Sequence, residues 1–328
     1  MIIDQLVEAI KVKRNPTVVG LDTTYEFLPP TIQRLCNSPA DIAVQITDYN
    51  RRLIDGLKDI VPAVKVQSAY YEMYGWDGMR AFAETLDYAK ACGLITIADV
   101  KRNDIGATAK AYAQAYLSGF TVNFNDFRIN DDNFKNGVYD PNKGEYVFRP
   151  QLVRYFNCDF MTVNGYLGSD GVMPFVDACR ENDKGIFILV KTSNPSSDDF
   201  QDLNLRGNTG TVYRRMAKFV HEWGSDLKGT SGFSPIGAVV GATRPEQGAE
   251  LRHAFPSMFF LIPGFGAQGA RASDVRGFFR DGEGGIVNNS RGIISAWQKK
   301  YYQGMTAVNA AIAAATDMRN DLRIALDL

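Results

Sequence analysis

The chain has 328 residues, of which 45% are hydrophobic and 22% are charged. These fractions are ordinary for a globular protein and exclude a disordered or collagen-like chain. Thirty-six basic and 37 acidic side chains leave a net charge of −1, so the chain has no bulk positive field for nucleic acid or an anionic membrane. We therefore expect neither as a partner, and any bound anion must be held by a local site.

The cysteines and the N-terminus indicate a cytoplasmic protein. Cys36, Cys92, Cys158 and Cys179 lie far apart in the sequence, without a CxxC pair or a Cys/His cluster. This spacing favours free packing thiols over a disulfide framework or a zinc site. The N-terminus has no basic segment followed by an apolar one, and no apolar run approaches the roughly 18 residues of a spanning helix.

Short apolar, β-branched runs alternate with longer helical patterns along the chain, which predicts parallel βα units. Eight strands are expected, at residues 17–22, 63–67, 94–101, 160–164, 185–191, 236–242, 258–263 and 285–291. Helices are expected at residues 42–57, 78–91, 107–117, 171–181, 211–223, 246–254, 270–279 and 307–324. Eight such units predict an α/β protein, a single TIM (β/α)8 barrel spanning residues 1–328, with its active site at the carboxyl ends of the strands.

One segment does not fit the alternation. Residues 119–157 are polar, aromatic and rich in Asn, Asp and Gly. The segment is too long for an ordinary connection. We expect an insertion after the third helix of the barrel rather than a second domain.

Acidic and basic side chains alternate at the predicted strand ends. Asp22 ends the first strand, Lys65 lies in the second, and Asp99 and Lys101 lie in the third, with Asp104 just beyond. Because a strand repeats every two residues, Asp99 and Lys101 should share one face. The other polar residues expected at this rim are Lys191, Ser193, Arg244, Gln268 and Arg291.

This alternation favours a charge network without a metal ion, because each ammonium group neutralises an acid and repels a divalent cation. The alternative is a set of salt bridges that seals the barrel end, although burying so many charges for structure alone is costly. His221 and His253 fall in helical patterns, away from any strand end. Lys101, flanked by carboxylates, is therefore the best candidate for a proton donor.

The loops after the seventh and eighth strands are rich in glycine. Barrels of this type often bind phosphate there, and Arg291 could supply the guanidinium. Residues 264–269 also match G-x-G-x-x-G, a weak dinucleotide signature. The next strand ends in Asn289, Ser290 and Arg291 rather than the acidic residue that this signature requires. A dinucleotide site and a plain glycine turn remain alternatives.

The sequence D-x-K-x-x-D-I at residues 99–105 resembles a motif of a known protein family. Further motifs accompany it in order: VGLD, KVQ, VNGYLGSDG, VKTSNPSS, VVGAT, IPGFGAQG and NNSRGI. Together they resemble the orotidine 5′-phosphate decarboxylase family, and more closely its longer bacterial subgroup, over nearly the whole chain. D-x-K-x-x-D alone is less specific, because metal-dependent hexulose-phosphate synthases and keto-gulonate-phosphate decarboxylases share it.

The resemblance implies that the chain converts orotidine 5′-monophosphate to uridine 5′-monophosphate without a cofactor or metal, the last step of de novo pyrimidine nucleotide synthesis. Lys101 would protonate the pyrimidine carbon, and Asp99 would lie against the departing carboxylate. The resemblance implies substrate-binding roles for Asp22 and Lys65 (ribose), Ser193 (pyrimidine), Pro263 (pocket wall), and Gln268 and Arg291 (phosphate). Asp104, Ile105 and Thr108 would reach into the neighbouring subunit's site, which implies a homodimer with shared active sites.

One motif departs from the subgroup, where VNPYLG is more usual than the VNGYLG of this chain; this should alter loop stiffness but no catalytic group. Three other functions are also considered. They are a magnesium-dependent sugar-phosphate lyase, an NADP-dependent oxidoreductase that uses GFGAQG, and a catalytically silent nucleotide-binding regulator. An intact set of Asp99, Lys101 and Asp104 argues against the regulator, which has no need of a proton donor among acids.

Overall fold

The computed structural model describes residues 1–122, 137–140, 145–148, 151–266 and 268–328. Within these residues, eight parallel strands close into a barrel in the order β1-β12-β11-β10-β9-β8-β3-β2. Their bounds are β1 (Thr17–Gly20), β2 (Ala63–Gln67), β3 (Ile95–Arg102), β8 (Phe160–Val163), β9 (Gly185–Lys191), β10 (Ser234–Val240), β11 (Met258–Ile262) and β12 (Gly285–Asn289). Each overlaps a predicted strand, so the predicted TIM barrel is confirmed.

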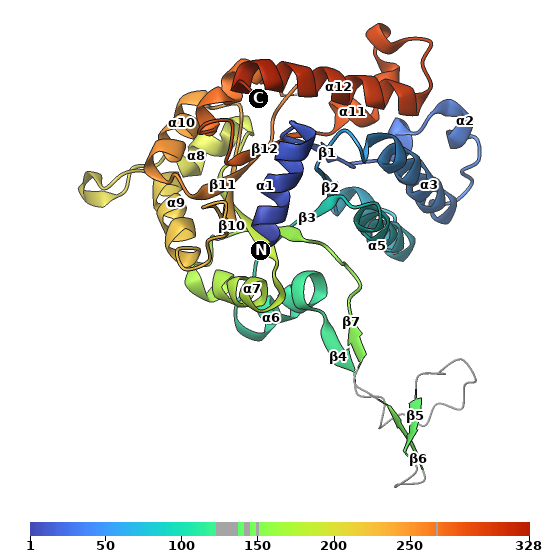
Figure 1. Cartoon of the computed structure of the whole chain (residues 1–328), viewed down its shortest axis with the longest axis horizontal. Helices are drawn as coiled ribbons and strands as arrows, with labels where there is room; N and C mark the ends of the chain where they lie inside the picture. The colour runs from blue at the N-terminus through green and yellow to red at the C-terminus, as the bar shows by residue number, and fades with distance from the viewer. Residues whose placement is uncertain (123–136, 141–144, 149–150, 267) are drawn as a thin grey trace.

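Helices surround the barrel, as Figure 1 shows. Seven long ones match predicted helices: α3 (Pro39–Leu57), α5 (Gly75–Ala91), α6 (Gly106–Ala113), α7 (Ser169–Asn182), α9 (Val212–Trp223), α10 (Pro245–Ala254) and α12 (Ala307–Leu326). Short helices lie in the loops: α2 (Pro30–Gln33), α4 (Ala69–Glu72), α8 (Asp198–Gln201) and α11 (Arg291–Ile294). A side-chain cap marks the start of α3, where the Ser38 hydroxyl accepts a hydrogen bond from the Asp41 N–H.

Besides these short helices, one long helix was not predicted, because it precedes the first strand and so lies outside the βα alternation. This helix, α1 (Ile2–Lys13), buries an apolar face of Ile2, Ile3, Leu6, Val7 and Ile10. These residues form one core cluster with side chains of the barrel interior, including Phe160, Phe187 and Phe259. The helix crosses the barrel in Figure 1, and its packing against the interior leaves the carboxyl ends of the strands for the ligand site.

Two predicted helices differ from the structure. The helix predicted at 270–279 is instead a 3₁₀ helix, η6 (Ala272–Phe278). Gly269 has a φ of 95°, outside the helical range, and the Asp274 carboxylate accepts a hydrogen bond from the Arg271 N–H at 2.7 Å, which fixes a tight first turn. The helix predicted at 107–117 ends at Ala113 and continues as a π-helical turn, η2 (Gln114–Ser118).

The insertion begins directly after this turn, where it was predicted. Strand β4 (Phe120–Val122) pairs antiparallel with β7 (Gln151–Val153), and β5 (Gly137–Asp140) pairs with β6 (Glu145–Phe148). At its base, the Phe156 ring stacks on Tyr116 with centroids 4.9 Å apart. Figure 1 places the four strands outside the ring of helices. The rest of the predicted segment, residues 123–136, 141–144 and 149–150, lies outside the described residues.

The cysteines and histidines lie in the settings that the sequence predicted. All four cysteines carry free thiols, and His221 and His253 lie in α9 and α10 as predicted. Among the helices of the described residues, none is long and apolar enough to cross a membrane.

Candidate active site

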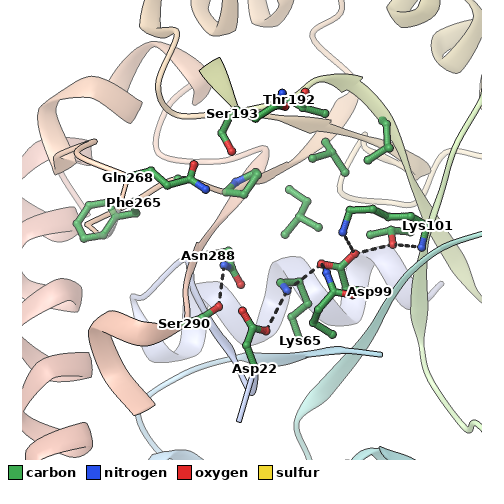
Figure 2. A pocket seen from close by; sticks show the side chains of 18 of the residues that line it. Asp22, Lys65, Asp99, Lys101, Thr192, Ser193, Phe265, Gln268, Asn288 and Ser290 are labelled. Carbon is green, nitrogen blue, oxygen red and sulfur yellow. Dashed lines mark hydrogen bonds and ion pairs between the residues drawn. The ribbon is translucent and has the colours of Figure 1, made fainter. Parts of the chain in front are cut away.

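A cavity of about 450 Å³ opens at the carboxyl ends of the barrel strands, a size typical of small-ligand sites. Figure 2 shows the acids and lysines on one side, with Ser193, Phe265 and Gln268 across from them. Eight predicted site residues line it: Asp22, Lys65, Asp99, Lys101, Ser193, Pro263, Gln268 and Arg291. They come from six strand ends that are far apart in the sequence.

Asp99 is the centre of the charged side of the cavity. Its Oδ2 accepts hydrogen bonds from Lys65 Nζ at 2.9 Å and Gln67 Nε2 at 3.0 Å. Its Oδ1 accepts from Lys101 Nζ at 2.6 Å. Lys65 Nζ also lies 3.5 Å from Asp22 Oδ1. The acids and lysines predicted from the strand ends therefore form one network.

Burial and charge compete within this network. Burial disfavours the ionised form of Asp99, but the ammonium groups of Lys65 and Lys101 outweigh it and hold its pKa below the ordinary value. Burial likewise disfavours the charged form of Lys65, yet Asp22 and Asp99 raise its pKa above the ordinary value. Both groups are thus charged at neutral pH, in an enclosed setting where charges act strongly on a ligand.

The backbone at Lys101 is not that of a regular strand. Lys101 has a φ of 45°, which is uncommon for a residue other than glycine. The pairing of β3 with β8 shifts here, since Ala98 lies opposite Met161 but Arg102 lies opposite Val163. Asp99 and Lys101 do face the same cavity, as predicted, but a bulge rather than a simple two-residue repeat brings their side chains together.

Ser193 and Gln268 converge on the opposite wall. Gly264, which follows β11 with a φ of 105°, lies between them. A Cβ atom at Gly264 would lie 3.1 Å from Gln268 Oε1 and 3.3 Å from Ser193 Cβ. The missing side chain therefore lets the loops after β9 and β11 approach each other closely.

Arg291 stands at the start of α11, directly after β12, and is exposed at the cavity. Among the described residues, no carboxylate lies within ion-pair distance of its guanidinium. A free guanidinium at a cavity wall can donate two parallel hydrogen bonds to the oxygens of a phosphate.

Two residues expected at the rim do not line the cavity. Lys191 is fully buried, and its Nζ contacts Asp198 at 2.9 Å and Asp202 at 3.0 Å. Arg244 also pairs with Asp198, at 2.6 Å. Both basic residues therefore fasten the loop after β9, because acidic residues of that loop lie within reach.

The predicted residues Asp104, Ile105 and Thr108 do not line the cavity of their own chain. Asp104 Oδ1 accepts a hydrogen bond from the Ile105 N–H at 2.8 Å. Ile105 is 54% exposed, and Thr108 is exposed on α6. All three side chains belong to the outer surface beside the cavity.

Several polar lining residues were not selected from the sequence: Gln67, Tyr70, Thr162, Thr192, Asn194, Asn288 and Ser290. The two-residue repeat of β2 could have pointed to Gln67, which follows Lys65 on the same strand face. Asn288 and Ser290 fall within the quoted NNSRGI motif. Thr162 gave no signal, since threonine is common in strands.

Within the described residues, no cluster of three or more His, Cys, Asp or Glu side chains could hold a metal ion. The carboxylates of the cavity already contact lysine ammonium groups. Such a donor set does not suit a divalent cation, which prefers carboxylates and water without ammonium groups at contact distance.

The glycine-rich loop at residues 264–269 had also been interpreted as a dinucleotide site or a plain glycine turn. Gly264, Gly266 and Gly269 all have positive φ, so the loop needs glycine for its own conformation. It leads into the 3₁₀ helix η6 rather than the α-helix of a dinucleotide fold. The described residues of this loop therefore do not provide the structural setting of the dinucleotide signature.

The family model described as orotidine 5′-phosphate decarboxylase / HUMPS matches residues 17–124 and 147–301. The chain belongs to this family. The match covers all eight barrel strands and passes over residues 125–146, which lie inside the predicted insertion. The resemblance read from the motifs is confirmed.

Two curated relatives extend over almost the whole chain. Orotidine 5′-phosphate decarboxylase of Clostridium acetobutylicum is 36% identical over 98% of this chain and 99% of its own. The enzyme of Clostridium novyi with the same name is 39% identical, covering 93% of this chain and 92% of its own. Among solved structures, Leishmania donovani OMP decarboxylase is similar with a TM-score of 0.69 and 26% identity, covering 100% of this chain and 99% of that chain.

Proposed function

We propose that this protein is a carboxy-lyase that removes CO₂ from orotidine 5′-monophosphate to give uridine 5′-monophosphate, the last step of de novo pyrimidine nucleotide synthesis. One observation carries the proposal: the Lys101 ammonium is bonded to buried Asp99 in a cavity whose walls also hold Arg291 and Gln268. Family membership and the names of the relatives support the same activity. The free thiols are typical of a reducing compartment, and we place the enzyme in the cytoplasm.

The chemistry needs a proton donor at one carbon of the ring. When the bond between the ring and its carboxylate breaks, CO₂ leaves and the bonding electron pair stays in the plane of the ring. No cofactor is invoked to absorb that pair, so fixed positive charge and prompt protonation must stabilise it. Lys101 Nζ supplies both, because it is charged and carries hydrogens for transfer to the carbon.

Asp99 is the proposed partner of the departing carboxylate. Two like charges ~4 Å apart at an effective dielectric of ~20 repel by about 4 kcal/mol, and this repulsion disappears as CO₂ leaves. Enzymes lower barriers by roughly 8–23 kcal/mol, so this contribution alone is too small. Most of the effect must come from binding groups remote from the reacting carbon, which position the substrate.

The remaining cavity residues are the proposed binding groups. Arg291 and Gln268 bind the phosphate, and Ser193 hydrogen-bonds to the pyrimidine. Pro263 forms part of the cavity wall. Asp22 and Lys65 bind the ribose. Lys65 is already oriented for this by its contacts to Asp22 and Asp99. A substrate bound at both walls would therefore place its carboxylate beside Asp99 and Lys101.

We propose further that the enzyme is a homodimer whose subunits share active sites. Exposed apolar side chains lie on the loops that follow the carboxyl ends of β3, β8 and β9, namely Ile105, Tyr166, Leu167 and Phe200. Exposed apolar groups of this kind mark contact surfaces. In such a dimer, Asp104, Ile105 and Thr108 would enter the partner's cavity, which accounts for their place outside their own.

Hybrid dimers test this sharing. Lys101→Ala and Asp104→Ala subunits carrying different tags are co-expressed and purified through both tags. In a two-fold dimer one of the two sites then has both native residues, so the hybrid should show about half of the wild-type activity per dimer. Each parent dimer should be nearly inactive. Hybrids no more active than their parents would contradict the sharing of sites, as would a monomer in sedimentation.

Metal removal tests the reaction itself. Protein held in excess EDTA should decarboxylate orotidine 5′-monophosphate at its full rate, followed by the loss of substrate absorbance, because the charge network needs no divalent ion. The magnesium-dependent sugar-phosphate lyase predicts instead that EDTA removes activity and that Mg²⁺ restores it. Binding of a nicotinamide dinucleotide, measured by calorimetry on the same sample, would support the oxidoreductase and oppose our proposal.

A further inference from the structure

The hydroxyl of Thr162 lies at the bulge that carries Asp99 and Lys101. Thr162 is in β8, on the neighbouring strand, and is 1% exposed. Residues 99–101 of β3 face Thr162 alone, because Ala98 pairs with Met161 and Arg102 pairs with Val163. The backbone N–H groups of the bulge therefore cannot all find partners in a regular strand ladder.

Thr162 provides those partners. Its Oγ1 accepts hydrogen bonds from the N–H of Val100 and from the N–H of Lys101, both at 2.9 Å. The ladder resumes one residue later, where the Asn164 N–H donates to the Arg102 carbonyl at 2.9 Å. The side-chain oxygen thus replaces a backbone acceptor where Lys101 has its φ of 45°.

The same hydroxyl has one hydrogen, and its direction is fixed by chemistry. Both backbone groups are donors, so the hydroxyl can only accept from them. Its own hydrogen is then directed to Asp99 Oδ1, which lies 2.8 Å away. That oxygen also accepts from Lys101 Nζ. A single buried hydroxyl therefore holds the proposed proton donor by its backbone and the donor's carboxylate partner by its side chain.

We infer that Thr162 is a positioning residue for decarboxylation, which sets the backbone of Lys101 and the carboxylate of Asp99 in their reactive arrangement. The inference rests on the proposed function, since it takes Lys101 as the proton donor. A left-handed conformation at a lysine is unfavourable and persists only where its surroundings hold it. Without the Thr162 hydroxyl, the bulge can relax and the ammonium group can leave its place beside the reacting carbon.

The test compares Thr162→Ala with Thr162→Ser. Misplacing a reacting group by about 1 Å can cost on the order of 100-fold in rate, and we expect a loss of kcat of this size in Thr162→Ala. KM and the Kd of uridine 5′-monophosphate should stay near the wild-type values, because the phosphate and ribose groups are not changed. Thr162→Ser, which keeps the hydroxyl, should retain most of the turnover.

The chain offers a matched control at Thr96, in β3 near its other end. Thr96 is also buried, and its hydroxyl donates to Asp159 Oδ2 at 3.0 Å and accepts from the Asp159 N–H at 3.1 Å. Thr96→Ala should thus lose stability in urea to a degree similar to Thr162→Ala, but keep kcat. A kcat in Thr162→Ala equal to that of Thr96→Ala would overturn the inference, and so would a weaker product affinity that accounts for the whole loss.

Two further measurements keep the outcome decisive. If Thr162→Ala does not fold, Thr162→Cys replaces it, because a thiol is a weak donor and acceptor and the same loss of kcat is expected. Lys101→Ala is assayed beside it. An active Lys101→Ala would refute the proposed proton donor, whereas an inactive Lys101→Ala beside a fully active Thr162 variant would refute only the role of Thr162.

Discussion

Replacing Lys101 by alanine should abolish measurable decarboxylation, a loss of at least about 10⁴-fold, because the ring carbon then lacks both its proton source and the nearest positive charge. Uridine 5′-monophosphate should still bind to this variant. The groups proposed for the phosphate and the ribose, Arg291, Gln268 and Asp22, stand on other strand ends and remain in place. Activity is measured by the loss of substrate absorbance, and product affinity by calorimetry.

The fold of this variant can be checked independently. The Lys101 side chain is 45% exposed, and Asp99 keeps its contact with Lys65 Nζ at 2.9 Å when Lys101 is removed. The urea midpoint should therefore change little. Lys228→Ala, at an exposed lysine between α9 and β10, serves as the control and should keep full activity. Near-normal turnover in Lys101→Ala would remove the proposed mechanism.

Replacing Arg291 by alanine should chiefly weaken binding. A hydrogen bond to a charged group contributes about 1.5–3 kcal/mol, so we expect KM and the Kd of uridine 5′-monophosphate to rise about 10- to 150-fold. Arg291→Lys keeps the charge but loses the planar pair of donors, so it should fall between the wild type and the alanine variant. Steady-state kinetics and calorimetry measure both quantities.

The nucleoside orotidine provides the decisive comparison for Arg291. It lacks the phosphate, so the wild type and Arg291→Ala should process it with the same low efficiency. The effect of the mutation should thus depend on the phosphate of the substrate. An unchanged affinity for uridine 5′-monophosphate, or an equal loss for the nucleoside, would disprove the phosphate role of Arg291.

The partial exposure of Lys101 argues against a purely structural role for the charge network. A structural salt-bridge cluster would satisfy its own charges and leave no group for a ligand. Here Lys101 is 45% exposed while its partner Asp99 is buried. The buried Asp99 carboxylate is therefore held by the protein, while the Lys101 ammonium group that contacts it lines the cavity.

The barrel, and all the charged residues that line its cavity, could be predicted from the sequence alone. Each strand is a short apolar run bounded by polar or glycine residues, a pattern set by neighbours along the chain. In a parallel barrel all strands end on the same side. Polar residues at strand ends as distant as Lys65 and Arg291 could therefore be assigned to one site before any contact was known.

Two residues, Lys191 and Arg244, were wrongly predicted to line the cavity because only their charge and their position at strand ends were considered. Lys191 and Arg244 stand at strand ends like the other rim residues, but Asp198 in the loop after β9 contacts both. Whether a basic side chain faces a ligand or an acidic loop depends on the path of that loop. The sequence pattern of the strands carries no information about that path.

The way in which Lys101, the proposed proton donor, is held could not be predicted without the tertiary structure. The positive φ of Lys101 arises from a bulge against β8, and its hydrogen-bond acceptor, Thr162, lies 61 residues along the chain. The place of helix α1 in the core was likewise not predictable, because it depends on packing of its apolar face against side chains of the barrel interior. Periodicity reports which face of a segment is buried, whereas the partner of a buried polar group depends on strand register, which distant residues set together.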